Sequence, residues 1–198
     1  IVLSAEQEKA YAFALSHDAS LLFGDTGSGK TEVYMKLFET CINKGQKALF
    51  LLPEIGLTPQ MKRRLKHHFG SHVAIWHSKI SAKKKEQILH DLQTGKLTIL
   101  AGTRSTLFLP IDNLGLIVVD EEHDESYKSS SRPRYNAKDL SLLFGQKLGA
   151  KVVLGSATPS LPSFHKLPHF RLKGTFFDSS SHILYDEGEH GISQMMLA

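Results

Sequence analysis

The sequence has few of the features that mark secreted, disulfide-rich or membrane proteins. Its single cysteine, Cys41, excludes a disulfide framework and a cysteine-based zinc site within these 198 residues, so a reducing compartment is expected. No uninterrupted apolar run approaches the ~20 residues that a membrane-spanning helix needs. The first residues, IVLSAEQ, lack the pattern of a signal peptide. We therefore expect a cytoplasmic protein without a membrane partner.

Charge of one sign is not in large excess either. The 24 basic and 20 acidic residues give a formal net charge of +4, which only weakly favours a polyanionic partner. The basic residues are nevertheless clustered at 62–66, 83–85 and 128–134, and each cluster fits a solvated surface as well as a phosphate contact. The histidines lack the spacing of metal ligands. We interpret His67, His68, His72 and His77 as surface or phosphate-contact residues.

A phosphate-binding loop is the strongest motif. Residues 20–31, SLLFGDTGSGKT, run from a short apolar strand through glycines into a helix, and they match the pattern G-x-x-x-x-G-K-[ST]. Glycines let backbone amides surround a phosphate at a helix N-terminus. Lys30 is expected to reach the β- and γ-phosphates of a nucleotide, and the Thr31 hydroxyl to hold Mg²⁺.

Gln7 has two interpretations, which are not exclusive. Ser4 and Gln7 have the spacing of a capping box at the start of a helix over residues 4–16. A glutamine upstream of a phosphate-binding loop can also pair with the N6 and N7 edge of adenine.

An acidic segment supplies the second half of the expected site. Residues 116–119 are apolar without alternation, which is typical of a strand buried on both faces of a parallel sheet. The sequence Asp-Glu-Glu-His follows at 120–123. Asp120 is expected to hold Mg²⁺ and Glu121 to polarise an attacking water. The upstream Gly-Lys-Thr favours this interpretation over a plain acidic turn.

Strands and helices alternate along the rest of the chain. With 41% hydrophobic residues, the chain can bury one domain plus an appendage. Further strands are predicted at 47–52, 73–76, 98–101 and 151–154, which gives an open, mostly parallel α/β sheet with helices on both faces. The pattern fades near the end. Residues 1–175 are therefore expected to form one domain, and 176–198 a linker with the truncated start of another.

Polar loops follow several of the predicted strands, where α/β folds bind ligands. Residues 53–60 and 102–110 offer hydroxyls and a cation to phosphates, although plain turns remain an alternative. Residues 124–135 interleave aromatic and basic side chains, as single-strand binders do, although a flexible surface loop is also possible. Ser156 and Thr158 are expected to hydrogen-bond His123 and Asp120 across the sheet. The residues expected to contact DNA are Thr58, Arg104, Ser105, Thr106, Tyr127, Lys128, Arg132 and Arg134.

The order of these motifs resembles that of superfamily 2 DNA helicases, most closely the bacterial primosomal replication-restart helicases. The resemblance rests on GDTGSGKTEVY, LLPEIGLTPQ, GTRSTLFLP, VVDEEHDESYK, PRYNAKDLS and GSATPSL, in which DEEH has the DExH form. It implies the first RecA-like lobe of an ATP-dependent 3′-to-5′ helicase that acts in replication restart and primosome assembly at stalled forks. ATP and Mg²⁺ are the implied cofactors.

The resemblance also implies roles for individual residues. It implies catalytic roles for Lys30, Asp120, Glu121 and His123, and coupling roles for Ser156 and Thr158. It gives the loop at 124–135 a role in linking DNA occupancy to hydrolysis. The residues expected to bind the nucleotide are Gln7, Gly24, Thr26, Gly27, Ser28, Gly29, Lys30 and Thr31.

The sequence departs from this family in two respects. Asp25 places a carboxylate in the phosphate-binding loop, as in double-stranded DNA translocases such as RecG or the transcription-repair coupling factor, which are one alternative. A nucleotide-gated module that docks primosome partners is another. The chain also has no second lobe, arginine finger or zinc-binding cysteines. It is therefore expected to be one nearly inactive lobe of a larger protein, with zinc only in the remainder. Single-stranded or forked DNA, primosome proteins and single-strand-binding proteins are the implied partners of that protein, which would lie in the bacterial cytoplasm with the nucleoid.

Overall fold

The inner strands of the protein are apolar on both faces. In the computed structural model, which describes residues 1–174, they belong to a seven-stranded sheet with the order β3-β4-β2-β5-β6-β1-β7, in which every neighbouring pair is parallel. The predicted parallel α/β sheet is confirmed. Its strands are β1 (Ala19–Phe23), β2 (Lys47–Leu51), β3 (Val73–Trp76), β4 (Ile99–Gly102), β5 (Leu114–Val119), β6 (Lys151–Ser156) and β7 (His169–Arg171). The expected linker and second-domain start, at 176–198, lie outside the described residues.

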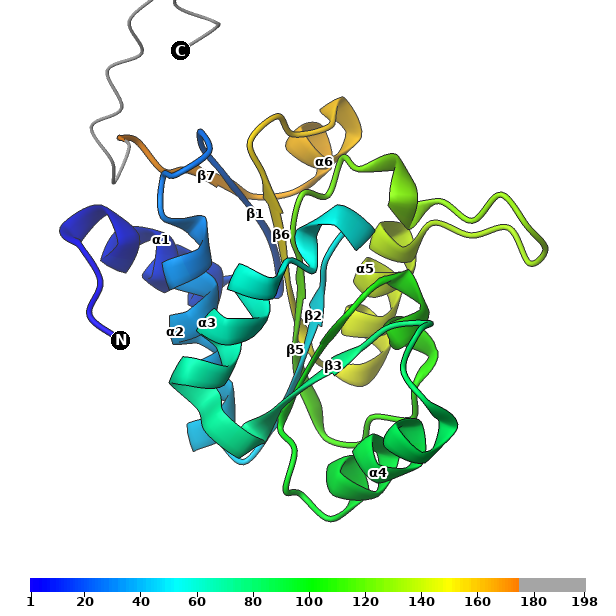
Figure 1. Ribbon diagram of the computed structural model, residues 1–198. Coiled ribbons are helices and arrows are strands. Elements are labelled where there is room, and N and C mark those ends of the chain that lie inside the picture. The colour runs from blue at the N-terminus through cyan, green and yellow to red at the C-terminus, as the bar shows by residue number, and fades with distance from the viewer. Residues whose placement is uncertain (175–198) are drawn as a thin grey trace, which may run out of the picture.

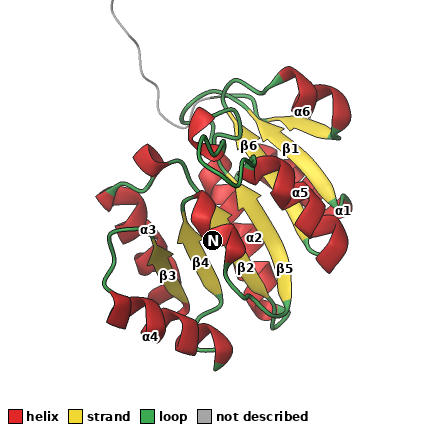
Figure 2. Ribbon diagram, turned by 90° about the vertical axis from the view of Figure 1, so that its right-hand side faces the viewer, coloured by secondary structure: helices red, strands yellow, loops and turns green. Residues whose placement is uncertain are grey.

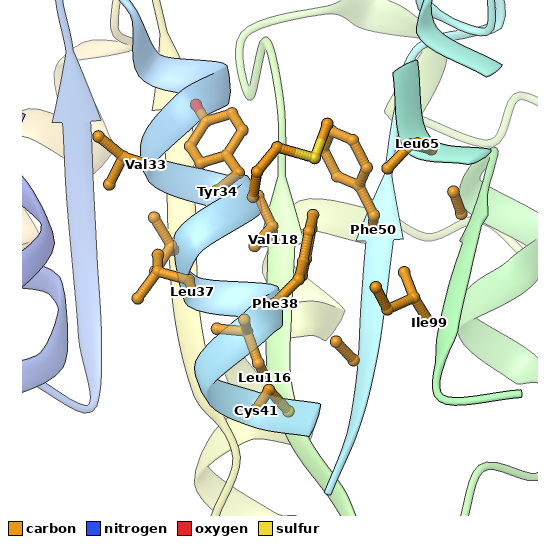
Figure 3. Close-up of a cluster of buried hydrophobic side chains, with 14 of the residues drawn as sticks. Val33, Tyr34, Leu37, Phe38, Cys41, Phe50, Leu65, Ile99, Leu116 and Val118 are labelled. Carbon is orange, nitrogen blue, oxygen red and sulfur yellow. The ribbon is translucent and has the colours of Figure 1, made fainter. Parts of the chain in front are cut away.

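Helices cover both faces of this sheet (Figure 1). The helices α1 (Ala5–Ser16), α2 (Lys30–Asn43) and α3 (Pro59–Phe69) lie on one face, and α4 (Ala82–Gln93) and α5 (Ala137–Leu148) lie on the other. Alternate residues of each strand point to opposite faces, so Phe50 belongs to the core under α2 while Leu49 belongs to the core under α4 and α5. Figure 3 shows the first of these cores, in which Phe38 of α2 packs beside Phe50.

The helix boundaries follow local sequence signals. The predicted capping box is present, with the Ser4 side chain accepting from the Gln7 amide at 3.3 Å and the Gln7 side chain accepting from the Ser4 amide at 2.8 Å. Asn136 caps α5, and Gly149 ends it with a φ of 68°. The Thr58 hydroxyl accepts a hydrogen bond from the Met61 amide and so caps α3. Its expected contact with DNA stays a prediction.

Two elements near residue 170 have no clear sequence signal. The short helix α6 (Leu161–Lys166) leads to β7, which pairs with β1 at the edge of the sheet. Its residues His169 and Arg171 are exposed, so the strand lacks the apolar pattern of the inner strands. Among the described residues, no helix has the length and apolar character needed to cross a membrane.

Parallel strands bring their carboxyl ends to one rim. The loops after β1, β2, β3, β4, β5 and β6 therefore share an edge of the sheet, although they are far apart in the sequence. These loops include the predicted phosphate-binding loop, the polar segments and the acidic segment. The tertiary structure thus gathers the predicted functional residues at one rim.

Candidate nucleotide-binding site

The phosphate-binding loop joins β1 to α2, as predicted. Gly29 immediately precedes α2 and has a φ of 87°, a backbone conformation that residues other than glycine rarely adopt. A Cβ at this position would lie 2.2 Å from Nε2 of Gln7. The glycine is thus required both by the backbone turn and by the close approach of α1.

One cavity joins the two predicted halves of the site. It has a volume of about 450 Å³, and Lys30 and Thr31 from α2 line it together with Asp120 and Glu121 from the end of β5. The expected convergence of Lys30 and Asp120 is therefore confirmed. The remaining lining residues are Thr26, Gly27, Gly29, Glu32 and Arg64.

Lys30 is buried and is held by the loop itself. Its Nζ donates to the carbonyl oxygens of Gly24 at 2.6 Å and Asp25 at 3.3 Å. Burial lowers the pKa of Lys30, although the nearby carboxylates of Glu121, Asp120 and Asp25 act in the opposite direction. The side chain thus brings a positive charge to a cavity whose lining also includes three carboxylates and a second cation, Arg64.

Asp120 has the carboxylate whose pKa is shifted most from its ordinary value. Burial, and then the neighbouring charge of Glu121, raise the pKa of Asp120 to about 6. The Tyr34 hydroxyl donates to its Oδ1 at 3.2 Å. The sequence predicts that Ser156 and Thr158 hydrogen-bond Asp120, but their hydroxyls contact His123. The hydrogen-bond partner of the Asp120 side chain is instead Tyr34, a buried residue of α2.

The donors around Asp120 fit a magnesium ion. Mg²⁺ keeps several waters and is usually bound by one or two protein oxygens together with substrate phosphates. The Thr31 hydroxyl and the Asp120 carboxylate, which line the same cavity, supply such a pair. In the described part of the chain, no group of three or more His, Cys, Asp or Glu side chains is arranged to hold a metal ion.

The two glutamates after Asp120 point to different surroundings. Glu121 has a φ of 46°, a strained conformation for a residue with a side chain, and it faces the cavity. Glu122 is buried and accepts from the Lys138 Nζ at 2.9 Å and the Ser160 amide at 2.6 Å. Although burial opposes it, these bonds and one from Ser163 lower the pKa of Glu122. Glu122 thus ties the acidic segment to α5 and α6.

His123 makes the expected contacts across the sheet. Its Nδ1 lies 2.8 Å from the Ser156 hydroxyl, and its Nε2 lies 3.4 Å from the Thr158 hydroxyl. The Ala157 amide donates to Glu121 at 3.4 Å. The end of β6 and the turn after it therefore hydrogen-bond Glu121 and His123, but not the Asp120 side chain.

Gln7 serves the capping role in this structure. Its oxygen accepts from the Ser4 amide, and its Nε2 donates to the Gly29 carbonyl at 3.4 Å. Only 2% of the residue is exposed. Both ends of the side-chain amide are thus engaged, one in the helix cap and one in the phosphate-binding loop, and the adenine interpretation remains a prediction.

Three of the predicted DNA contacts interact with other parts of the protein or are buried in it. Tyr127 is buried, and its hydroxyl lies 2.6 Å from the carbonyl oxygen of Asp120, so its ring is not available to stack on a base. Thr106 is fully buried, and its hydroxyl has no hydrogen-bond partner. Arg104 donates to the carbonyl oxygens of residues 126 and 128. Base stacking by Tyr127 and a surface hydroxyl of Thr106 were therefore wrong expectations, because the 3-10 helices at 104–108 and 125–127 turn these two side chains inward. A phosphate contact by the half-buried Arg104 stays a prediction.

The other predicted DNA contacts lie at the surface. They are Thr58, Ser105, Lys128, Arg132 and Arg134. The last three belong to residues 128–136, a loop that projects from the body of the protein before α5 (Figure 1) and is closed by a bridge between Lys128 and Asn136. This loop is consistent with the surface role that its composition predicted.

Sequence reasoning missed several residues of the site. Arg64 comes from a basic cluster for which the sequence left both a solvated surface and a phosphate contact open, and it pairs with Glu32 and lines the cavity. Tyr34 and Glu122 were not identified as site residues. No local pattern could have identified them, because their partners are distant in the sequence. Arg64 is 32 positions from Glu32, Tyr34 is 86 positions from Asp120, and Glu122 is 16 positions from Lys138.

Replacing Tyr34 with phenylalanine should weaken magnesium-dependent nucleotide binding. The substitution removes the donor to Asp120, and a hydrogen bond to a charged group contributes about 1.5–3 kcal/mol, so we expect affinity to fall about tenfold or more. Titration of a fluorescent ATP analogue with and without Mg²⁺ would measure this. Tyr11→Phe is the matched control, because the Tyr11 hydroxyl bonds Thr40 away from the cavity. Equal affinities for the two variants would contradict the role assigned to Tyr34.

The fold and the site together define a helicase class. Residues 4–167 match the model of the DEAD/DEAH box helicase family, so the chain belongs to that family. It is 47% identical over 199 residues to the replication restart protein PriA of Helicobacter pylori (strain ATCC 700392 / 26695), covering 99% of this chain and 32% of that protein. It is 45% identical over 148 residues to the replication restart protein PriA of Bacillus subtilis, covering 75% of this chain and 18% of that protein. The resemblance to the replication-restart helicases is thereby confirmed.

Solved structures agree with this assignment. The structure of RecG bound to a three-way DNA junction is 25% identical with a TM-score of 0.62, covering 83% of this chain and 22% of that chain. The helicase domain of Pyrococcus furiosus Hef, at 17% identity and a TM-score of 0.61, covers 83% of this chain and 37% of that one and shares the fold. The RecA-like lobe is thus confirmed. The chain spans about a third of the length of the Helicobacter relative.

Proposed function

We propose that this chain is the nucleotide-binding motor lobe of an ATP-dependent DNA helicase that acts in replication restart. The single observation that carries the proposal is the shared cavity of Lys30, Thr31, Asp120 and Glu121. Family membership and the similarity to PriA proteins support the choice of a helicase acting at replication forks. The 3′-to-5′ polarity and primosome assembly are part of this proposal.

The residues of the cavity would divide the work of nucleotide binding and hydrolysis. Lys30 would exchange its contacts with the loop carbonyls for contacts with the phosphates. Thr31 and Asp120 would hold Mg²⁺, which supplies positive charge beside the phosphates when bound. Glu121 would orient and polarise a water molecule, and its strained backbone keeps its carboxylate on the cavity wall.

The rim of the sheet would carry the DNA strand and report its presence to the cavity. Thr58, Ser105 and the basic residues of the loop at 128–136 are exposed for phosphate contacts. Arg104 holds the segment around Tyr127, whose hydroxyl bonds the Asp120 carbonyl. We therefore assign Arg104 and Tyr127 to coupling between DNA and the cavity, alongside His123, Ser156 and Thr158.

The isolated lobe would bind nucleotide weakly and turn it over very slowly. An arginine finger contributes roughly 10³ to 10⁵ in rate, and the proposed finger lies in a second lobe that follows the domain at 1–175. In the parent protein, closure of two lobes on single-stranded or forked DNA would give directional stepping in the bacterial cytoplasm. Other parts of the parent protein would bind zinc and would dock primosome and single-strand-binding proteins.

A double-stranded DNA translocase is the second candidate. The 25% identity to RecG and the Asp25 that follows Gly24 support it. Strand displacement by the parent protein on a forked substrate separates the two functions, because a helicase releases the displaced strand and a pure translocase does not. Restart that survives Lys30→Ala in the parent would instead indicate a docking module.

The first test concerns Lys30. Replacing it with alanine removes the cation that faces the phosphates, so we expect binding of a fluorescent ATP analogue by this chain to fall at least a hundredfold, which is about 2.7 kcal/mol. Lys44→Ala is the matched control, because it makes the same charge change just beyond the opposite end of α2. Equal binding by the two variants would refute the proposed site. Turnover at helicase rates by the wild-type chain alone, with single-stranded DNA present, would refute the need for a second lobe.

A further inference from the structure

Arg64 lines the nucleotide cavity but does not belong to any of the segments that bind phosphate or metal in the proposed function. The other lining residues come from the phosphate-binding loop, the start of α2 and the acidic segment after β5. Among the described residues, Arg64 is the one contribution of α3 to this cavity. Figure 2 shows α3 at the β3 and β4 end of the sheet, so Arg64 enters the cavity from the side away from β1.

Packing of α3 against α2 holds Arg64 at this place. Phe69 of α3 is buried in the core beneath α2, where the centres of the Phe69 and Phe38 rings lie 6.2 Å apart. On the helix fixed in this way, Arg64 is half-buried and pairs with Glu32, in the first turn of α2. Arg63, the preceding residue, is exposed to solvent. The fold thus separates two arginines that the sequence places in one basic cluster.

The ion pair between Arg64 and Glu32 is open to exchange for another anion. Their side chains are 35% and 30% exposed, and ion pairs in contact with solvent contribute little to stability. In the described part of the chain, Glu32 is also the only hydrogen-bond partner of the guanidinium, which has several N–H donors. Most of these donors therefore remain available to a ligand.

The charges in the cavity favour such an exchange when a nucleotide binds. Glu32 is one of three carboxylates on the wall, with Asp120 and Glu121, and a nucleoside triphosphate adds several negative charges beside them. The planar guanidinium binds a phosphate through two parallel N–H···O bonds, which are stronger than hydrogen bonds between neutral groups. When Arg64 turns from Glu32 to the nucleotide, it lowers the electrostatic cost of bringing phosphates next to these carboxylates.

The order of the strands indicates which phosphate Arg64 meets. Backbone amides of a phosphate-binding loop cradle the α- and β-phosphates, and this loop follows β1. Asp120 follows β5, and α3 follows β2, which lies beyond β5 as seen from β1. A triphosphate that extends from the loop toward Asp120 thus presents its terminal phosphate to Arg64, whereas a diphosphate ends closer to the loop.

We propose that Arg64 distinguishes a bound nucleoside triphosphate from a diphosphate. It pairs with Glu32 in the absence of nucleotide and turns to the terminal phosphate when a triphosphate binds. This inference rests on the proposed function and adds to it a specificity-determining residue outside the recognised motifs, since LLPEIGLTPQ ends at Gln60. Lys30 contacts the β-phosphate of either nucleotide, whereas Arg64 contacts only a nucleotide with a third phosphate.

The test compares two variants that break the same ion pair. Arg64→Ala removes the phosphate contact, so we expect affinity for a non-hydrolysable ATP analogue with Mg²⁺ to fall about tenfold, as for the loss of one hydrogen bond between charged groups. Affinity for ADP should change by less than about twofold, because ADP lacks the phosphate that Arg64 contacts. Glu32→Gln frees Arg64 and removes a repelling carboxylate, so affinity for the ATP analogue should rise. Competition against a fluorescent ATP analogue measures each affinity.

Two further variants separate recognition from charge and from folding. Arg63→Ala is the matched control, because it makes the same charge change at an exposed position of α3, and it should leave both affinities unchanged. Arg64→Lys keeps the positive charge but lacks the planar fork, so it should recover only part of the loss. Thermal unfolding is followed for every variant, and Tm should stay close to that of the wild type because the broken ion pair is partly exposed.

Three results would overturn the role of Arg64 alone. Equal losses for the ATP analogue and ADP in Arg64→Ala would show that Arg64 contributes only to the general charge of the cavity. Equal losses in Arg64→Ala and Glu32→Gln would show that the pair only joins α2 to α3. Affinities of Arg64→Ala equal to those of Arg63→Ala would show that Arg64 does not meet the nucleotide. Failure of the proposed function is a different result, in which the wild-type chain binds neither nucleotide or Lys30→Ala binds both as tightly as the wild type.

Discussion

Replacing Glu122 with alanine is expected to destabilise the domain by about 3–5 kcal/mol, the usual effect of removing one partner from a buried ion pair. The Glu122 side chain is fully buried and accepts four hydrogen bonds, from Lys138, from the amide and hydroxyl of Ser160, and from Ser163. Without it, the Lys138 ammonium, which is 11% exposed, would lose its anionic partner. Urea unfolding followed by circular dichroism measures the loss.

A surface pair in the next turn provides the control. Glu125 pairs with Lys128 at 2.9 Å, but its side chain is 80% exposed. Exposed pairs contribute about 0–1 kcal/mol, so Glu125→Ala should leave stability almost unchanged. A Glu122→Ala protein that is as stable as Glu125→Ala would contradict the assigned role. Glu122→Leu combined with Lys138→Met should recover part of the loss, because no unpaired charge remains buried.

Replacing Gly155 with alanine should damage both stability and magnesium-dependent binding. A Cβ at this position in β6 would lie 1.6 Å from the Tyr34 hydroxyl oxygen and 3.1 Å from Oδ1 of Asp120. Overpacking of this kind costs about 1–3 kcal/mol and sometimes more. Because Tyr34 must move away, Asp120 loses its hydrogen-bond donor as well. Urea unfolding and titration of a fluorescent ATP analogue at several Mg²⁺ concentrations measure the two effects separately.

Gly45 offers a control that changes stability without touching the site. It has a φ of 68° just beyond α2, with open space where a Cβ would lie. Gly45→Ala should therefore lose about 1–2 kcal/mol through backbone strain and keep its affinity for the magnesium nucleotide. Adding Tyr34→Phe to Gly155→Ala removes the closest clashing atom and should recover part of the stability. Unchanged magnesium dependence in Gly155→Ala would show that Asp120 does not rely on this packing.

Local signals account for the parts of the fold and site that could be predicted. The unbroken apolar run at 116–119 could be assigned to an inner strand because only a strand covered on both faces needs no polar residues. The glycines before Lys30 predicted the loop because the phosphate-binding turn needs that backbone freedom. The capping box at Ser4 and Gln7 is likewise complete within four residues.

The inward direction of Tyr127 could not be predicted from such local signals. An alternation of aromatic and basic residues predicts a nucleic-acid surface, but it does not reveal whether one of the rings fills the core. Tyr127 is buried because the short helix after Asp124 turns it toward the carbonyl oxygens of Leu51 and Asp120. Those acceptors become available only once β2 and β5 are paired.

The sequence by itself determined the class of this protein, its inner strands and longer helices, and which residues are expected to bind phosphate and metal, because each of these depends on residues that are neighbours in the chain. The tertiary structure alone decided which side chains face those groups. Tyr34 reaches Asp120 and Arg64 reaches Glu32, because a parallel sheet collects distant segments at one rim. Such contacts follow from strand order and register, which no local pattern in the chain encodes.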